Sequence, residues 1–278
     1  MAQILEQVRN EILLAIKNDE LVLPTLPEVA LRVRDVAMDP EATMDQLAKV
    51  IGNDPSLSAR VIKVANSPIM RASRKIEDLQ MALSRLGMDY TCNIATGLAM
   101  EQMFQATSDM VDKRLRQIWN RSAEVAGIAH VLCRHYTNLR PDQATLAGLV
   151  HQIGALPILT YAENHSALLK DAITLDTVIE KLGPAIGNRI LATWDFPEEI
   201  RRIPSEHLDF TCQKPVVDYA DVVTVAVLQS YAGTNHPLAK IDFHKVTAFA
   251  RLGLDPDMQF AEGEDLSEDM AMAMELLK

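Results

Sequence analysis

Seven histidines and three cysteines are the side chains of this 278-residue chain best suited to metal binding or nucleophilic chemistry. Cys92, Cys133 and Cys212 are odd in number and too far apart for a CxxC zinc pattern, so we expect reduced thiols. His130 and His135 fall on one expected helix and are interpreted as packing or surface residues. The GxSxG, GxxxxGK[ST] and HExxH motifs do not occur, which gives no support to a serine hydrolase, a P-loop enzyme or a zincin.

The composition of the chain restricts the classes of partner that it could bind. The net charge is −11, which argues against a nucleic-acid partner because such binding draws on many Lys and Arg contacts with phosphates. The longest aliphatic stretch, 222–228, is too short to span a bilayer, and residues 1–10 have no signal-peptide pattern. We expect a cytoplasmic protein with no membrane partner.

Helical periodicity dominates the chain. Ile4, Val8, Ile12 and Ile16 recur every four positions, which predicts an amphipathic first helix. Prolines in 23–27 end it and begin a second helix that runs to Met38. Thr43 and Gln46 form the pattern of a capping box, and Asp54 before Pro55 is a predicted N-cap.

The remaining segments also favour helices, which gives an all-α fold. Asp78 is a predicted N-cap of the next helix, which ends at Gly87. The later helices are predicted over 90–104, 115–135, 142–161, 175–182, 185–194, 197–208, 215–231 and 243–252. The valine-rich part of 215–231 could suggest a strand, but it has no hairpin partner, so we predict a buried helix.

The length allows two lobes, since single cores stop growing near this size. We place the lobes at 1–110 and 111–254, because small and polar residues at 106–112 separate two apolar segments. Residues 255–278 form an acidic tail with a short amphipathic helix of Met270, Met274, Leu276 and Leu277. We expect that helix to dock either on the body or on a partner.

Several motifs occur in order along the chain. They are the LPxLP pattern at 23–27, IGNDPSLSAR at 51–60, VANS at 64–67, IWNRS at 118–122, AGLVHQIG at 147–154 and WDFPEEI at 194–200. Over roughly residues 20–230, this set resembles the HDOD family, a bacterial relative of the HD metal-dependent phosphohydrolases. The resemblance implies an N-terminal HDOD-specific lobe, an HD-phosphohydrolase-like C-terminal lobe, and a role in signal transduction or gene regulation.

The resemblance also implies where metal ligands would stand in an HD hydrolase. The position of the first ligand histidine is Arg121, a permanent cation without a lone pair for a metal. The naming pair reads His151-Gln152, and the next histidine would fall near Pro184. A later pair matches Glu206-His207, and the last carboxylate matches Asp221 or, less well, Asp218.

These substitutions leave two interpretations of the site. In the preferred one, His151 and His207 are polar residues of a pocket floor, Asp221 is paired with Arg121, and no cofactor is expected. In the alternative, His151, His207, Asp221 and Glu124 bind a single divalent metal. Arg121, Glu124, His151, His207 and Asp221 would line the ligand pocket in either case.

Three functions follow as hypotheses. The first is a non-catalytic signalling module that binds a protein partner or a small ligand. The second is a metal-dependent phosphohydrolase with a rebuilt site. The third is a nucleotide sensor in which Arg121 contacts phosphate, a group that guanidinium suits well.

Overall fold

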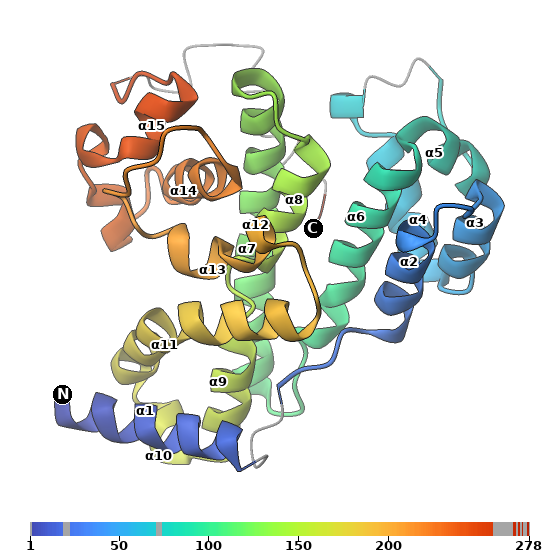
Figure 1. Cartoon of the computed structure of the whole chain (residues 1–278). Coiled ribbons are helices and arrows are strands. Elements are labelled where there is room, and N and C mark those ends of the chain that lie inside the picture. Colours follow the sequence, from blue (N-terminus) through green and yellow to red (C-terminus); the bar gives the residue numbers. More distant parts are fainter. Residues whose placement is uncertain are drawn as a thin grey trace.

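The computed structural model describes residues 2–18, 23–70 and 74–257, together with 269, 270, 272, 274 and 277. The described part is helical and contains no strand (Figure 1), which confirms the predicted all-α class. Part of the predicted acidic tail, namely residues 258–268 and Leu276, lies outside the described residues.

The first half of the chain forms six α-helices and two 3₁₀ turns. They are α1 (Ala2–Lys17), α2 (Glu28–Met38), α3 (Met44–Gly52), α4 (Pro55–Ala65), η1 (Pro68–Met70), α5 (Leu79–Leu86), α6 (Met88–Ala99) and η2 (Met100–Met103). The predicted caps are confirmed: the Thr43 amide donates to Gln46 Oε1 at 2.7 Å, and Asp54 Oδ1 accepts the Leu57 amide at 3.0 Å. Asp78 caps α5, and Gly87 follows it with a φ of +79°, a conformation that favours glycine.

The second half continues with helices of very unequal length. They are α7 (Asp109–Tyr136), α8 (Pro141–Val150), α9 (Ala155–Glu163), α10 (Ser166–Lys170), α11 (Ala172–Thr193), α12 (Glu198–Arg201), α13 (Ile203–Glu206), α14 (Tyr219–Ser230), η3 (Pro237–Lys240), η4 (Phe243–Lys245) and α15 (Thr247–Leu252). The valine-rich segment is α14, buried from Tyr219 to Leu228, which confirms the predicted buried helix.

The long helix α7 forms the centre of the molecule and packs against α8 and α14. On one side α2–α5 gather around α6, and α6 packs against both α2 and α8 (Figure 1). The first helix, α1, packs against α11 and so lies apart from the other helices of 1–110. Buried apolar residues from Ile12 to Leu277 form one continuous cluster, and the division into lobes stays a prediction.

Three predictions of helix boundaries near the expected site are wrong. The segment 197–208 is two short helices, α12 and α13, because Pro204 in the first turn of α13 has no amide to continue α12. The segment 142–161 is two helices, because residues 151–154 form a turn between α8 and α9. The segments 175–182 and 185–194 are one helix, α11, which continues through Pro184. Gly183 makes this continuation affordable, since a residue without a Cβ avoids the clash that proline imposes on the residue before it.

The stretch Pro141–Glu163 is long and apolar enough by length and composition to cross a membrane. It comprises α8, the turn and α9, and 83% of its most apolar window is buried inside the protein. Core helices of a folded domain pass the same length and composition test when they are mostly buried.

Candidate functional site

The centre of the candidate site is a buried histidine pair. His151 begins the turn after α8, and His207 follows α13 directly. Their ring centroids lie 5.1 Å apart with the planes at 84°, and both side chains are buried. His151 Nδ1 lies 2.6 Å from the Gly148 carbonyl oxygen, and His207 Nδ1 lies 2.9 Å from that of Ile203. These carbonyls accept hydrogen bonds, so each Nδ1 carries the proton and each Nε2 carries the lone pair.

Burial keeps both imidazoles neutral. Burial, together with the nearby His207 and Arg121, lowers the pKa of His151 to about 3. Burial likewise lowers the pKa of His207 to about 4, partly opposed by its backbone hydrogen bonds. His151 Nε2 is buried without a hydrogen-bond partner. A neutral imidazole with an unpartnered Nε2 is the form that binds metals, so His151 keeps one free nitrogen donor, and His207 Nε2 carries the second lone pair of the pair.

Arg121 lies on α7 and is held by three groups. Its Nη1 donates to Glu124 Oε2 at 2.8 Å and to the Ser230 carbonyl oxygen, and its guanidinium carbon lies 4.4 Å from the Tyr231 ring centroid. The Tyr231 ring stacks on His236 with a centroid distance of 3.8 Å. Glu124, predicted as a substitute carboxylate, therefore already binds a cation.

Asp221 does not pair with Arg121, and that prediction is wrong. Its carboxylate accepts from Arg251 at 2.6 Å and 3.0 Å, and Lys214 Nζ lies 3.9 Å away. Asp218 is the N-cap of α14: its Oδ1 accepts the Asp221 amide at 3.1 Å, and Asp221 Oδ2 accepts the Asp218 amide in return. The reason is geometric: Arg121 contacts Ser230 at the last turn of α14, whereas Asp221 lies in its first turn, about 14 Å away along the axis.

The other predicted positions lie around this centre. Gln152 is in the 151–154 turn, and Pro184 is inside α11. The turn and the helix are in close contact, because a Cβ added to Gly154 would lie 2.0 Å from the Gly183 carbonyl oxygen. Glu206 is paired with Lys214 at 3.1 Å.

The donor set does not fit the metal centre that the HD relationship implies. His151 and His207 offer two nitrogens, but the Asp221 carboxylate is neutralised by Arg251 and Arg121 has no lone pair. Within the described ranges, no group of three or more His, Cys, Asp or Glu side chains is placed to hold a metal ion. We therefore derive no chemical step through a metal.

His130 is a packing residue, as predicted from its position on α7. Its Nδ1 lies 3.1 Å from Thr145 Oγ1 and 3.3 Å from Tyr90 Oη, and its side chain is buried. Burial lowers the pKa of His130 to about 4, so the ring is neutral near pH 7.

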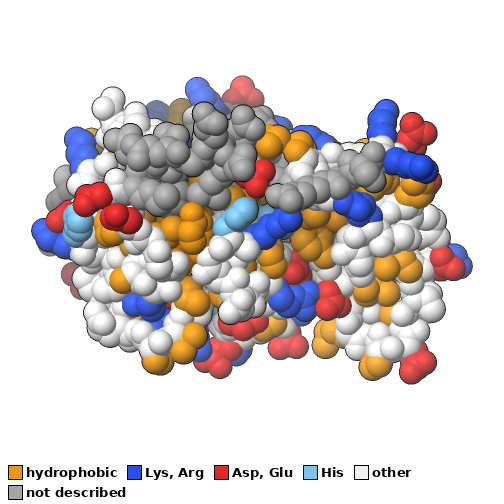
Figure 2. Space-filling view, turned by 90° about the horizontal axis from the view of Figure 1, so that it is seen from above, with side chains coloured by type: hydrophobic (Ala, Val, Ile, Leu, Met, Phe, Trp, Pro, Cys, Tyr) orange, Lys and Arg blue, Asp and Glu red, His pale blue; other side chains and the backbone are white. Residues whose placement is uncertain are grey.

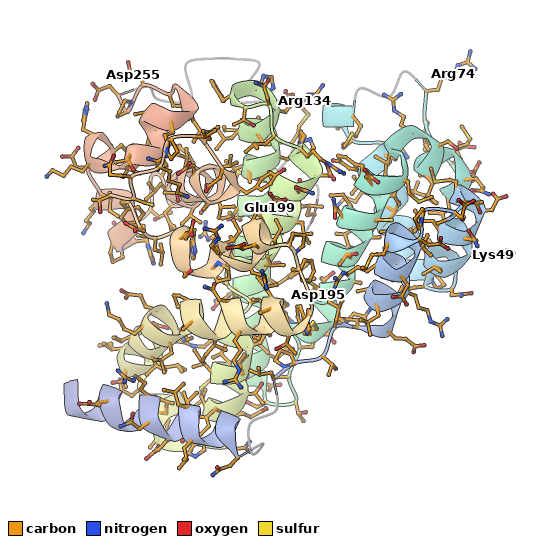
Figure 3. The ribbon with its side chains drawn as sticks, viewed as in Figure 1. Lys49, Arg74, Arg134, Asp195, Glu199 and Asp255 are labelled. Carbon is orange, nitrogen blue, oxygen red and sulfur yellow. The ribbon has the colours of Figure 1, made fainter. Side chains whose placement is uncertain are left out.

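Motif residues far apart in the sequence meet where α2 faces the end of α11. Trp194 Nε1 donates to the Pro24 carbonyl oxygen at 2.9 Å, which joins the WDFPEEI and LPxLP motifs. Arg34 donates to the carbonyl oxygens of Trp194 and Asp195 and lies 4.5 Å from the Phe196 ring centroid. Figure 3 labels Asp195 at this junction. Sequence reasoning missed both Arg34 and Arg251, since no local spacing links either arginine to its partner.

Asn66, another motif residue, does more than end α4. Its side chain donates to the Ile76 carbonyl oxygen at 2.7 Å and accepts the Ile76 amide at 2.7 Å. It therefore holds together the two ends of the connection between α4 and α5. Asn66 thus has a structural role, in which a side-chain amide satisfies a backbone donor and a backbone acceptor.

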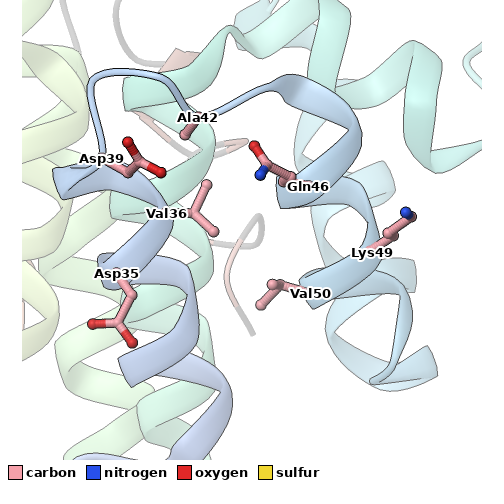
Figure 4. Close-up of a pocket in the computed structure, with 7 residues that line it drawn as sticks. All are labelled: Asp35, Val36, Asp39, Ala42, Gln46, Lys49 and Val50. Atoms are coloured by element: carbon pink, nitrogen blue, oxygen red, sulfur yellow. The ribbon is translucent and has the colours of Figure 1, made fainter.

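A groove of about 400 Å³ lies between α2 and α3 (Figure 4). It is lined by Asp35, Val36, Asp39, Ala42, Gln46, Lys49 and Val50. None of these residues belongs to the predicted site, so the groove is separate from the histidine pair.

The helical fold and the histidine-centred site define an HD-related protein, and comparison with known proteins places it further. The family model of the HDOD domain matches residues 23–210, so the chain belongs to the HDOD family. A crystal structure from Shewanella amazonensis SB2B, whose name provisionally assigns it to the metal-dependent phosphohydrolases, is 32% identical with a TM-score of 0.88. The match covers 100% of both chains.

Two further relatives are more distant. A Marinobacter aquaeolei VT8 structure, provisionally named a signal transduction protein, is 24% identical with a TM-score of 0.65 and shares the fold. The match covers 98% of this chain and 65% of that one. An uncharacterized protein of Treponema pallidum (strain Nichols) is 23% identical over 193 residues, 64% of this chain and 36% of the relative. The present chain thus spans about a third of that relative's length.

Proposed function

We propose that this chain is a non-catalytic regulatory HDOD module with a degenerate metal site, which acts by binding a protein partner or a small ligand. The observation that carries the proposal is the pairing of Asp221 with Arg251. That ion pair occupies the carboxylate which the resemblance best matched to a metal ligand. Arg121 in place of a ligand histidine supports the same conclusion, since its cation would repel a metal.

Membership of the family supports a regulatory, HD-related role in general. The binding partner and the loss of catalysis are what the proposal adds. The proposal also places the protein in the cytoplasm. This location is supported by three free cysteines, of which Cys92 and Cys133 are buried.

Metal content and hydrolysis test the proposal together. Purified protein is loaded with Mn²⁺ or Fe²⁺, desalted and measured by elemental analysis, and then assayed on bis(p-nitrophenyl) phosphate. We expect no stoichiometric metal and no turnover. About one equivalent of metal, with turnover lost in His151→Ala, would overturn the proposal.

A restored variant is the matched control. Arg121→His and Gln152→Asp return the two ligand types that the family resemblance implies next to His151. This double variant should bind a divalent metal more tightly than the unmodified chain, measured by calorimetry. That gain would show that the assay detects a site when donors are present.

A metal-dependent phosphohydrolase is the second candidate, favoured by the name of the Shewanella relative and by the two neutral histidines. The metal and hydrolysis measurements above decide between the two. A third candidate, a nucleotide sensor, is favoured by the Arg121 side chain, which is 28% exposed and stacks on Tyr231. Ligand-induced melting shifts lost in Arg121→Ala would support the sensor.

A further inference from the structure

The end of the chain returns to the body of the protein. Residues 269, 270, 272 and 274 are helical, and Met270 and Leu277 are 7% and 1% exposed. The Leu277 carbonyl oxygen accepts from Arg60 Nη2 at 3.0 Å. Asp269 Oδ2 lies 3.6 Å from His135 Nε2. Apolar burial and polar contacts therefore hold both ends of this segment.

The contact residues place the segment at the seam between the two groups of helices. Arg60 belongs to α4, donates to the Leu98 carbonyl oxygen of α6 at 3.1 Å and lies 6.0 Å from the Trp119 ring of α7. His135 is in the last turn of α7. The segment thus begins near the end of α7 and finishes near Arg60, bridging α7 and the α4–α6 side. Figure 2, seen from above, shows Lys, Arg and His side chains next to Asp and Glu side chains in the middle of the molecule.

The spacing of the apolar residues in this segment indicates which kind of helix the seam can bind. Met270, Met274 and Leu277 have the spacing i, i+4 and i+7 of one helix face. Met270 and Met274 are helical, Leu277 follows outside the helix, and all three pack against the core. Asp269, just before Met270, is the carboxylate next to His135, whereas Arg60 at the other end is already paired with Glu101 and contacts the main chain of Leu277. A helix of so few residues is not stable alone in water, so the seam holds it rather than its own propensity. A segment held in this way can be displaced by another helix with the same pattern of side chains.

We propose that the seam of α4, α6 and α7 is the docking site for an amphipathic helix of a partner protein, and that residues 269–277 occupy it in cis. The partner helix carries Met or Leu side chains at i, i+4 and i+7 and a carboxylate just before the first of them. Its main chain meets Arg60 and its carboxylate meets His135. The proposal rests on the regulatory function above by naming the class of partner, but peptide binding is measured independently of metal and hydrolysis, so either can fail alone.

The test uses the full chain and a fluorescent synthetic peptide of residues 266–278. In Leu277→Asp the chain's own segment loses its buried anchor, and the seam becomes available to the peptide. We expect fluorescence anisotropy to show at least about tenfold tighter peptide binding to this variant than to the unmodified chain, equivalent to about 1.4 kcal/mol. Equal binding to both chains would overturn the proposal.

Three controls make the outcome specific. A peptide with the Leu277→Asp change should not bind, and His135→Glu in the Leu277→Asp chain should weaken binding of the unmodified peptide through repulsion of Asp269. Asp269→Lys, a milder change in the segment, gives a second chain with a weakened occupant if Leu277→Asp fails to fold by circular dichroism. A concentration-dependent dimer of the unmodified chain, lost in Leu277→Asp, would mean that the segment docks on a second copy and would overturn occupancy in cis.

Discussion

The buried carboxylate of Asp221 forms an ion pair with Arg251. The Asp221 side chain is 3% exposed, and Arg251 contacts both of its oxygens. Removal of one partner from a buried pair leaves an uncompensated charge, which Lys214 at 3.9 Å offsets only in part. We expect Arg251→Ala to lower the free energy of unfolding by about 3 kcal/mol, measured by urea denaturation.

An exposed ion pair gives the comparison. Arg32 pairs with Glu28 one turn away on α2, with side chains 56% and 77% exposed. Solvent screens such pairs, so Arg32→Ala should cost no more than about 1 kcal/mol. Equal losses in Arg251→Ala and Arg32→Ala would contradict the assignment of Asp221 to a buried pair.

The buried histidines make stability depend on pH. In the folded chain the pKa of His151 is lowered to about 3 and that of His207 to about 4, against about 6.5 for an unfolded histidine. Below pH 6.5 the unfolded chain therefore binds more protons than the folded one. The stabilisation is fully present above pH 6.5 and is lost as the pH falls toward 4, by up to about 1.4 kcal/mol per pH unit for each histidine.

The pH dependence can be assigned to one residue. Urea denaturation between pH 7 and pH 5 should show a smaller slope in His151→Gln than in the unmodified chain. Ile153→Val, a change to a neighbouring buried side chain, should lower stability by about 1 kcal/mol at every pH and leave the slope unchanged. An unaltered slope in His151→Gln would count against the buried neutral form.

At the scale of elements, the turn before α9 depends on close contact with α11. A Cβ on Gly154 would lie 2.0 Å from the Gly183 carbonyl oxygen and 2.7 Å from the Gly187 nitrogen. Because both are backbone atoms of α11, the helices must move apart. We expect Gly154→Ala to cost about 3 kcal/mol, the upper end of overpacking effects, and to lower the melting temperature.

Gly52 provides the matched substitution, since it ends α3 and the nearest atom to an added Cβ is Leu79 Cδ2 at 3.9 Å. There alanine meets ordinary contact and has the better helix propensity. Gly52→Ala should leave the melting temperature unchanged or slightly raised. A similar loss in both variants would show that the 154–183 contact is not the cause.

The helices could be predicted because their signals lie close together in the sequence. Contacts between residues far apart in the sequence could not. The caps at Thr43 and Asp54 bond to amides three residues on, so sequence spacing alone identifies them. The continuation of α11 through Pro184 goes against the usual effect of proline, and the contact of Gly183 with Gly154 joins residues too far apart for any window of sequence. The partner of Asp221 is 30 residues away on α15, and several other cations could have reached it by sequence criteria. The histidine positions came from the family motifs, and only the structure shows the rings in contact.

At the scale of the molecule, the helices α2–α6 and the helices packed around α7 share one hydrophobic core. Both tryptophans lie at the junction between these two groups. Trp194 is bonded to Pro24, and Trp119 packs against Phe104 with Arg60 over its ring. Tryptophan fluorescence therefore reports on the junction, whereas far-ultraviolet circular dichroism reports on helices throughout the chain.

Because the buried apolar cluster is continuous across this junction, we expect the chain to unfold in one cooperative step, although its length would permit two. Urea transitions followed by fluorescence and by circular dichroism should coincide. Gly97 of α6 faces α8, and a Cβ there would lie 2.5 Å from Leu149 Cδ1, so Gly97→Val wedges the groups apart. In that variant the fluorescence transition should fall to lower urea than the dichroism transition. Separate transitions in the unmodified chain would mean that each group of helices is held by its own core, and the junction would then be an interface between domains.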